Sequence, residues 1–257
     1  MTATERETVQ ALLAWYAAMG ADEAIGDHPV DCFAASMPTP SPSPPRVQPR
    51  PRPAAAIAAL GSEARIDISQ AGTLAALEAM VASFEGCALK RTAKSLCFKR
   101  GRDDARIMLI GEAPGRDEDL SGKPFVGRAG QLLDRMLGAI GLAEDHVYIT
   151  NTVYWRPPGN RTPTPEEVEA CAPFLARQIE LKSPQVLVLL GGAAAKNILG
   201  VAEGIMRLRG KWLNYASGGR DIPTLATLHP AFLLRNPEHK RLVWRDLLSV
   251  KEKLEAP

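Results

Sequence analysis

Four short apolar runs, separated by helical patterns, constrain the fold of this chain more than any other feature of its 257 residues. They cover 106–110, 147–151, 185–190 and 224–228 and are rich in Ile, Val and Leu. Continuous runs of this kind are typical of strands that are covered on both faces of a sheet. Strands that alternate with helices form parallel sheets through right-handed crossovers. The sequence therefore predicts one α/β domain with a four-stranded, mainly parallel sheet.

The helices between these runs have recognisable ends. One carries apolar residues at helical spacing over 132–140 and stops at Gly141. A second begins at Thr164, where Thr-Pro-Glu-Glu forms a capping box with proline in the first turn. We expect Pro173 to bend or split this second helix. Further helices are predicted over 193–200 and 243–254.

The N-terminal quarter of the chain has a different composition. A capping box over residues 4–7 predicts a short amphipathic helix within 1–30. Residues 38–53 hold eight prolines and no acidic residue. That composition does not fold onto a core, so 31–62 is predicted to be a flexible linker. The α/β domain is then expected to occupy 63–257.

Composition also restricts the setting in which the chain works. Its 46% of hydrophobic residues are enough for a sizeable core, yet no stretch is long and apolar enough to cross a membrane. The first twenty residues lack the apolar segment of a secretory signal. The four cysteines are irregularly spaced and do not suggest a disulfide framework. We therefore expect a cytoplasmic protein with no membrane partner.

The distribution of charge leaves room for a nucleic-acid partner. The net charge of +2 argues neither for nor against nucleic acid. Residues 90–106, however, contain seven Lys or Arg against two Asp, and residues 204–220 contain four basic residues and no acidic one. Such patches can bind phosphates, and ordinary solvated surface charge is the alternative.

Three of the predicted strands lead into residues that carry chemistry. The first stops at Gly111 and is followed by Glu112, an acidic turn and the aromatic Phe125. Another strand ends in Asn151, and the last leads into His229. The carboxyl ends of parallel strands share one edge of a sheet, and ligands bind there. We therefore expect Glu112, Phe125, Asn151 and His229 to converge on one pocket.

Each of these residues also has an ordinary explanation. Asn151 can cap a turn, His229 can be structural, and Phe125 can belong to the core. The glycine-rich segment after the first strand is not a Walker loop, because its glycines are too far apart and no Ser or Thr follows Lys123. The joint occurrence at successive strand ends, each beside Gly or Pro, favours a functional site.

Five segments together resemble the family 4 uracil-DNA glycosylases. They are Gly-Glu-Ala-Pro-Gly (111–115), Gly-Lys-Pro-Phe-Val-Gly-Arg-Ala-Gly (122–130), Thr-Asn (150–151), Arg-Pro-Pro-Gly-Asn-Arg (156–161) and His-Pro-Ala-Phe-Leu-Leu-Arg (229–235). Their order and spacing match the family over residues 80–255. The resemblance implies a three-layer α/β/α fold. It also implies a DNA-repair enzyme that flips uracil out of DNA and hydrolyses its N-glycosidic bond, releasing free uracil and leaving an abasic site.

The resemblance also implies roles for the residues at the strand ends. The flipped uracil would stack on Phe125, beside Ala113. Asn151 would present one acceptor and one donor to N3–H and O4 of uracil. Cytosine has a donor where uracil has an acceptor, so a fixed amide would reject it. His229 would donate to O2 and stabilise the departing uracil anion.

Carboxylates near the sugar would stabilise its oxocarbenium-like charge and orient the attacking water. In another branch of the superfamily an Asp orients that water, and here its position holds Ala113. The candidates in this chain are therefore Glu112, Asp117 and Glu118. Glu118 matches the family's acidic position, and excluding the methyl group of thymine is an alternative role for it.

Residues around the pocket are expected to hold the DNA. Leu233 or Leu234 would wedge into the gap left by the flipped base, and ordinary packing explains one of the two. Arg235 would contact a phosphate. The other predicted DNA contacts are Arg128, Arg156, Asn160 and Arg161.

The cysteines depart from the family's pattern. Family 4 enzymes hold a [4Fe–4S] cluster through four cysteines. Here Cys87 and Cys171 match two of those positions, whereas Lys90 and Trp155 stand at the others. Because such clusters need four thiolates, we expect no metal and no cofactor, with apolar packing around Trp155 instead. A three-cysteine site with a substitute ligand is the alternative.

Whatever its function, we expect the protein to be a monomer. Two other functions compete with uracil excision. Relatives that trap uracil-containing DNA without turnover carry a basic insertion ending in His after the Thr-Asn strand. Here the corresponding loop, 154–165, is short and contains no His. The second alternative is an interaction role with a silent pocket, in which changes at Asn151 and His229 would leave DNA handling unaffected.

Overall fold

The computed structural model describes residues 67–255 of the chain. Within that range, no helix combines the length and the apolar character that a membrane span requires. The predicted N-terminal helix, the predicted linker and the predicted domain boundary at residue 63 lie outside the described residues.

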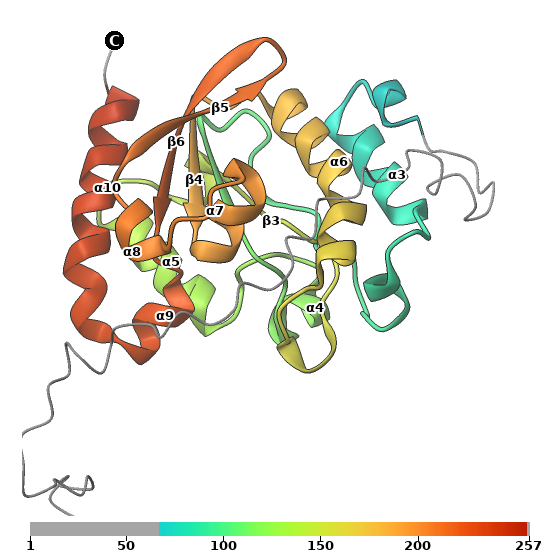
Figure 1. Cartoon of the computed structure of the whole chain (residues 1–257), viewed down its shortest axis with the longest axis horizontal. Coiled ribbons are helices and arrows are strands. Elements are labelled where there is room, and N and C mark those ends of the chain that lie inside the picture. The colour runs from blue at the N-terminus through green and yellow to red at the C-terminus, as the bar shows by residue number, and fades with distance from the viewer. Residues whose placement is uncertain (1–66, 256–257) are drawn as a thin grey trace, which may run out of the picture. The chain divides into compact units, whose positions relative to one another are not determined.

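A six-stranded sheet in the order β1-β3-β2-β4-β6-β5 forms the centre of the described structure (Figure 1). Its four inner strands are parallel: β3 (Val147–Asn151), β2 (Ile107–Gly111), β4 (Val186–Leu190) and β6 (Arg220–Thr227). The antiparallel edge strands are β1 (Arg100–Gly101) and β5 (Trp212–Ser217). The α/β class and the mainly parallel sheet are confirmed, and all four predicted strands are present. The predicted number of four strands is wrong.

The two edge strands escape prediction because neither contains an apolar run. β1 has only two residues, Arg100 and Gly101, which is too short to show a pattern. In β5 partly buried and exposed residues are mixed, and none is fully buried. An edge strand pairs on one side only and is not enclosed like an inner strand, so its composition approaches that of a loop.

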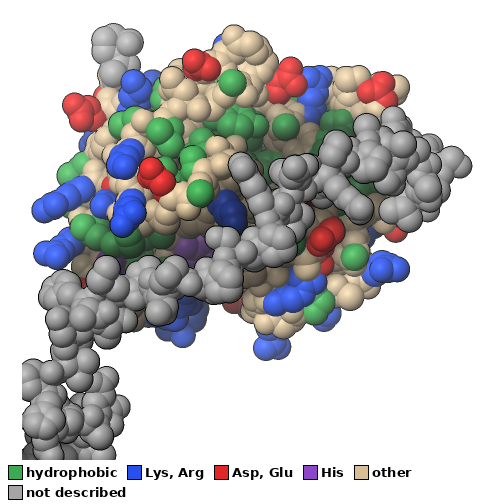
Figure 2. All heavy atoms as spheres, viewed as in Figure 1, with side chains coloured by type: hydrophobic (Ala, Val, Ile, Leu, Met, Phe, Trp, Pro, Cys, Tyr) green, Lys and Arg blue, Asp and Glu red, His purple; other side chains and the backbone are tan. Residues whose placement is uncertain are grey.

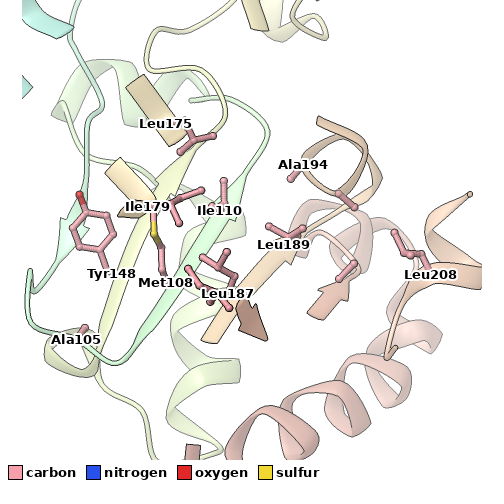
Figure 3. Close-up of a cluster of buried hydrophobic side chains, with 13 residues drawn as sticks. Ala105, Met108, Ile110, Tyr148, Leu175, Ile179, Leu187, Leu189, Ala194 and Leu208 are labelled. Atoms are coloured by element: carbon pink, nitrogen blue, oxygen red, sulfur yellow. The ribbon is translucent and has the colours of Figure 1, made fainter. Parts of the chain in front are cut away.

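Helices cover both faces of the sheet and make it the middle of three layers (Figure 1). One face carries α6 (Pro165–Lys182), α7 (Gly192–Leu199) and α8 (Ile205–Leu208), and the other carries α5 (Arg128–Gly138) and α10 (Lys240–Glu255). Met108 and Ile110 of β2 pack with Ile179 of α6 (Figure 3). Their neighbours in the strand point to the opposite face. Burial on both faces explains why these strands are continuously apolar.

Shorter helices connect the layers. α4 (Arg116–Ser121) follows the carboxyl end of β2, and α9 (Pro230–Arg235) follows that of β6. α3 (Leu74–Ser83) packs on α6. Short 3₁₀ helices span Ile68–Gln70, Ala88–Arg91, Glu144–His146, Pro158–Asn160 and Pro237–His239.

The predicted start of α6 is confirmed, and its predicted interruption is not seen. Thr164 is the N-cap: its hydroxyl accepts from the Glu167 N–H, and the Glu167 carboxylate accepts from the Thr164 N–H at 2.8 Å. The helix then runs unbroken through Pro173. A proline inside a helix costs about 3 kcal/mol, but Phe174 and Leu175 are buried directly after it. This packing on α3 and the sheet holds the helix together.

A buried glutamine joins α6 to β3. Gln178 is fully buried, and its side-chain carbonyl accepts from the Tyr154 hydroxyl at 2.9 Å. Its amide N–H groups donate to the Tyr148 hydroxyl at 2.8 Å and to the Phe98 carbonyl at 3.3 Å. One side chain thus satisfies several polar groups that burial has removed from water.

We expect Gln178→Leu to lower the free energy of unfolding by about 2–5 kcal/mol, because each buried hydroxyl left without a partner costs about 1–3 kcal/mol. Urea denaturation followed by circular dichroism measures the change. Gln131→Leu, on the exposed surface of α5, is the matched control and should have little effect. Equal stability of the two variants would contradict the proposed role of the network.

Candidate active site

Asn151 ends β3 directly beside Gly111 of β2 in the parallel register. Its side chain is buried, yet neither amide atom, Oδ1 or Nδ2, has a hydrogen-bond partner in the described part of the chain. A Cβ placed on Gly111 would lie 2.5 Å from both Asn151 Oδ1 and Phe125 Cζ, so the amide and the ring meet over this glycine. An unpaired buried amide is costly. We therefore expect a ligand with a complementary donor and acceptor to occupy this position.

Phe125 lies on the loop between α4 and α5 with a φ of +57°, which is unusual for a bulky side chain. The guanidinium of Arg100 holds the loop by donating to the Phe125 carbonyl at 2.5 Å and by pairing with Asp134 on α5. Gly130 allows this close approach, because a Cβ there would overlap the Phe125 carbonyl. Backbone strain of about 1–3 kcal/mol persists only where the surroundings enforce it, often at functional sites.

His229 follows β6 and caps α9. Its Nδ1 accepts the Ala231 N–H at 3.1 Å, so the neutral ring carries its proton on Nε2 and offers a donor there. Burial, with a smaller contribution from the positive charge of Arg235, lowers the pKa of His229 to about 4. The His229 ring lies 5.5 Å from that of Phe125, centroid to centroid. The structure thus brings Phe125, Asn151 and His229 together.

Glu118 is engaged with the backbone of the loop that carries Phe125. One carboxylate oxygen accepts the N–H groups of Val126 and Gly127 at 3.0 and 2.9 Å, and the other accepts that of Gly115 at 3.1 Å. The sequence suggested that this carboxylate faces the sugar or the uracil C5 position. Its contacts indicate that it also positions Phe125, because it accepts hydrogen bonds from three backbone N–H groups of this region.

The other two predicted carboxylates differ in burial. Glu112 directly follows Gly111 and is partly buried. Burial raises its pKa, opposed by a hydrogen bond from Thr162. Asp117 is exposed on the first turn of α4. Ala113, next to Glu112, is partly buried against the apolar cluster around Trp155. Glu112 is thus partly removed from water and directly follows the glycine over which the amide and the ring meet.

Asp119 and Arg100 support the site, and the sequence did not single out either. Asp119 is buried, accepts the backbone N–H groups of Lys94 and Ser95 at 2.8 and 3.2 Å, and lies 4.0 Å from Arg156. It therefore links three segments that are far apart in sequence. Asp119 belongs to a run of acidic residues, and Arg100 to a run of basic ones. No sequence signal distinguishes the buried members of such runs.

The predicted wedge is assigned to one leucine. Leu233 is fully buried in a cluster between α5, α9 and α10, which agrees with the ordinary packing that the sequence allowed for one of the two leucines. Leu234 is 36% exposed, and Arg235 beside it is exposed. Helix geometry decides the matter: successive residues of α9 point in directions about 100° apart, so only one of the two leucines faces the core.

The other predicted DNA contacts lie on exposed loops and helix ends. Arg128 is exposed at the start of α5. Arg156 is partly buried and donates to the Asn160 side chain at 2.6 Å. Arg161 makes a two-pronged ion pair with Glu167, at 2.8 and 2.6 Å. A phosphate would therefore have to compete with Glu167 for Arg161, but not for Arg128.

The residues at the family's cluster positions do not fit a [4Fe–4S] cluster. Cys87 and Cys171 are buried with their sulfur atoms 4.0 Å apart. Lys90 donates to the Ala82 carbonyl at 2.7 Å and pairs with Glu85, and the Trp155 indole has no lone pair to offer a metal. Among the described residues, no group of three or more His, Cys, Asp or Glu is arranged to hold a metal ion.

Apolar side chains surround Trp155. It is 3% exposed and packs edge-on against Tyr154, at 6.1 Å between ring centroids and 86° between ring planes. Phe98 and Leu96 belong to the same cluster. Cys97 points elsewhere, with its sulfur 3.2 Å from the Glu118 carbonyl. The corner between α3 and α6 is thus filled by aromatic and aliphatic side chains.

The sequence around this site is similar to that of known proteins. Residues 98–248 match the profile of the uracil DNA glycosylase superfamily. A type-4 uracil-DNA glycosylase of Archaeoglobus fulgidus is 42% identical over 176 residues, which cover 67% of this chain and 88% of that protein. One of Thermotoga maritima is 43% identical over 168 residues, covering 64% and 86%. A type-5 uracil-DNA glycosylase of Thermus thermophilus is 36% identical over 114 residues, covering 38% and 52%.

We expect the His229 ring to titrate with a pKa of about 4 in NMR spectra, assigned by the loss of its signals in His229→Gln. The reference pKa for an unfolded histidine is 6.5. The unfolded chain therefore takes up this proton first as the pH falls from 6.5 towards 4. Stability should decrease over that window in the wild type, and less in His229→Gln. A ring that titrates near 6.5 would contradict the buried, neutral state.

Proposed function

This chain belongs to the uracil DNA glycosylase superfamily, and from that premise we propose that it excises uracil from DNA during base excision repair. The reaction is hydrolysis of the N-glycosidic bond, which releases free uracil and leaves an abasic site. The observation that carries the proposal is the buried amide of Asn151, which has no hydrogen-bond partner among residues 67–255 and meets the Phe125 ring beside the neutral His229.

The Asn151 amide supplies the selectivity for uracil. Its carbonyl accepts N3–H and its N–H₂ group donates to O4, which leaves both amide atoms satisfied. Cytosine would place a donor against the N–H₂ group and an acceptor against the carbonyl. A site built for one hydrogen-bonding pattern discriminates strongly because the wrong base leaves buried polar groups unpaired.

Phe125 supplies the platform for the base. A base must leave the duplex before an enzyme can reach its glycosidic bond, at a cost of a few kcal/mol. Stacking on Phe125 offsets part of that cost, and the loop is already held in place by Glu118 and Arg100. Leu234 and Arg235, on the exposed side of α9, would fill the gap in the duplex and bind a phosphate.

His229 stabilises the leaving group. Negative charge develops on uracil O2 as the bond breaks, and a donor aimed at that atom lowers the barrier. The Nε2–H of a neutral ring is suited to this task, because it donates a hydrogen bond without transferring its proton to the product. The lowered pKa of His229 keeps the ring neutral at physiological pH.

Glu112 is the carboxylate that we assign to the sugar side of the reaction. The sugar gains oxocarbenium character as uracil departs, and a nearby carboxylate stabilises it and orients the attacking water. Glu112 follows Gly111, over which the amide and the ring meet. Asp117 is the exposed alternative, and Glu118 acts by holding the loop.

The residues present support an enzyme that works without a [4Fe–4S] cluster. Two thiolates, an ammonium and an indole are not the ligands of such a cluster, and the packing around Trp155 fills the corner instead. We also propose a monomer in the cytoplasm, a reducing compartment that suits the free thiols of Cys87, Cys97 and Cys171.

We expect Asn151→Ala and His229→Ala each to lower the single-turnover rate of uracil release by about 10²- to 10³-fold, the usual effect of removing one transition-state hydrogen bond. Asn197→Ala, on the exposed surface of α7, is the control and should keep the wild-type rate. Oligonucleotides with uracil, cytosine, thymine, hypoxanthine or xanthine define the range of bases. A denaturation-resistant protein–DNA adduct without released uracil would indicate a trapping protein instead.

We expect the purified protein to be colourless and to contain no stoichiometric iron. Replacing Lys90 and Trp155 by Cys in one double variant restores the family's four thiol positions, and this variant is expected to bind iron and turn brown. Lys90→Cys alone, with three thiols, is the matched control. Stoichiometric iron in the wild type would refute the cluster-free proposal, and it would leave the proposal of uracil excision standing.

A further inference from the structure

The face of the molecule behind α9 has an apolar groove that the proposed reaction does not use. It lies between the second half of α5 and the first half of α10 and encloses about 380 Å³. Its floor is formed by Leu233 of α9, Met136 of α5, and Val243 and Leu247 of α10. The groove is therefore open to solvent over an apolar floor.

Basic side chains stand around this apolar floor. Arg135 of α5 and Lys240 and Arg241 of α10 line the groove and are exposed. Of the described residues that line it, none is acidic. Figure 2 shows Lys and Arg side chains gathered over the part of this view where α10 lies, with hydrophobic side chains between them. The groove thus combines an apolar surface with positive charge. We therefore expect its ligand to carry flat apolar groups and negative charge.

Trp244 gives the groove an aromatic surface. It lines the groove from α10 and is 43% exposed, which is a large fraction for an indole. Sites for single-stranded nucleic acid combine this kind of ring, on which an unpaired base stacks, with cations that follow the phosphates. Bases in a duplex are already stacked on their neighbours. A single strand therefore matches the groove better than a duplex does.

The groove adjoins α9, the helix that carries two of the proposed DNA contacts. Leu233 forms part of its floor, and the next two residues are the exposed Leu234 and Arg235. α9 itself begins at His229. A DNA strand whose uracil enters the pocket and whose backbone crosses α9 would reach Trp244 next.

We propose that the α5–α10 groove binds the single-stranded flank of the DNA strand that carries the uracil. One unpaired base stacks on Trp244, and Arg135, Lys240 and Arg241 contact the adjoining phosphates. This proposal rests on uracil-containing DNA being the substrate. It adds a second contact region beyond the flipped nucleotide and gives the protein a preference for single-stranded over fully paired DNA.

The central test is the affinity for a uracil-free single-stranded oligonucleotide, measured by fluorescence anisotropy. Trp244→Ala is expected to weaken binding by about 5- to 100-fold, the range that corresponds to the loss of one base–aromatic stack. Trp244→Phe should restore most of the affinity. Leu248→Ala is the matched control, because Leu248 is also 43% exposed on α10 but does not line the groove.

The salt dependence of binding tests the phosphate contacts. Each phosphate contact to a single strand contributes about 0.7 to the magnitude of the slope of log affinity against log salt. The double variant Arg135→Ala and Arg241→Ala removes two such contacts, so the magnitude of this slope should fall by about 1.4. Lys196→Ala, an exposed residue of α7, should leave the slope unchanged. The single-turnover rate at saturating DNA should be the wild-type rate in all groove variants.

Two outcomes would overturn the inference. The first is that Trp244→Ala binds the oligonucleotide as tightly as the Leu248→Ala control, and the second is that an acidic amphipathic peptide occupies the groove without displacing DNA. Either result would make the groove a protein-docking site or a passive surface. Failure of the proposed enzymatic function is recognised separately, because it appears as the absence of uracil release in the wild type, whatever the binding data show.

Discussion

The parallel register between β2 and β3 is the constraint on which the candidate site depends. It sets Gly111 beside Asn151, so the amide emerges where the glycine leaves room for it. A shift by one residue would turn every side chain of a strand to the opposite face. Close packing on both faces opposes such a shift, because each side chain would have to fit a space shaped for its neighbour. The same register therefore determines both the packing of the core and the position of the Asn151 amide.

A second layer of organisation surrounds Phe125. Its backbone conformation is unfavourable, and charged groups that could have faced solvent are used to maintain it: the Glu118 carboxylate on one side and the Arg100 guanidinium on the other. Because the loop is held before any ligand arrives, little ordering remains to oppose binding. The Glu118 carboxylate of the acidic turn after β2 thus acts through the backbone, and Glu112 is the carboxylate that we assign to the sugar side of the reaction.

The parts of this structure that sequence could predict are those where burial leaves a repeating signal. The inner strands have continuous apolar runs, and Thr164 begins its helix with a recognisable cap. The convergence of strand-end residues then follows from topology. β5 leaves no such signal. Nor does sequence reveal which leucine of the pair 233–234 is buried or what the Glu118 carboxylate accepts, because both depend on the direction of single side chains.

The corner around Trp155 has a consequence for the way the protein matures. Everything that fills it, from the indole to the neighbouring aromatic rings, is encoded in the polypeptide. Under the cluster-free arrangement that we propose, folding would require no delivery of iron or sulfide and no assembly machinery. Such a protein would also offer no exposed metal for peroxide to attack. A repair protein built in this way stays available when the cell is starved of iron or under oxidative stress, conditions in which cofactor supply would otherwise limit it.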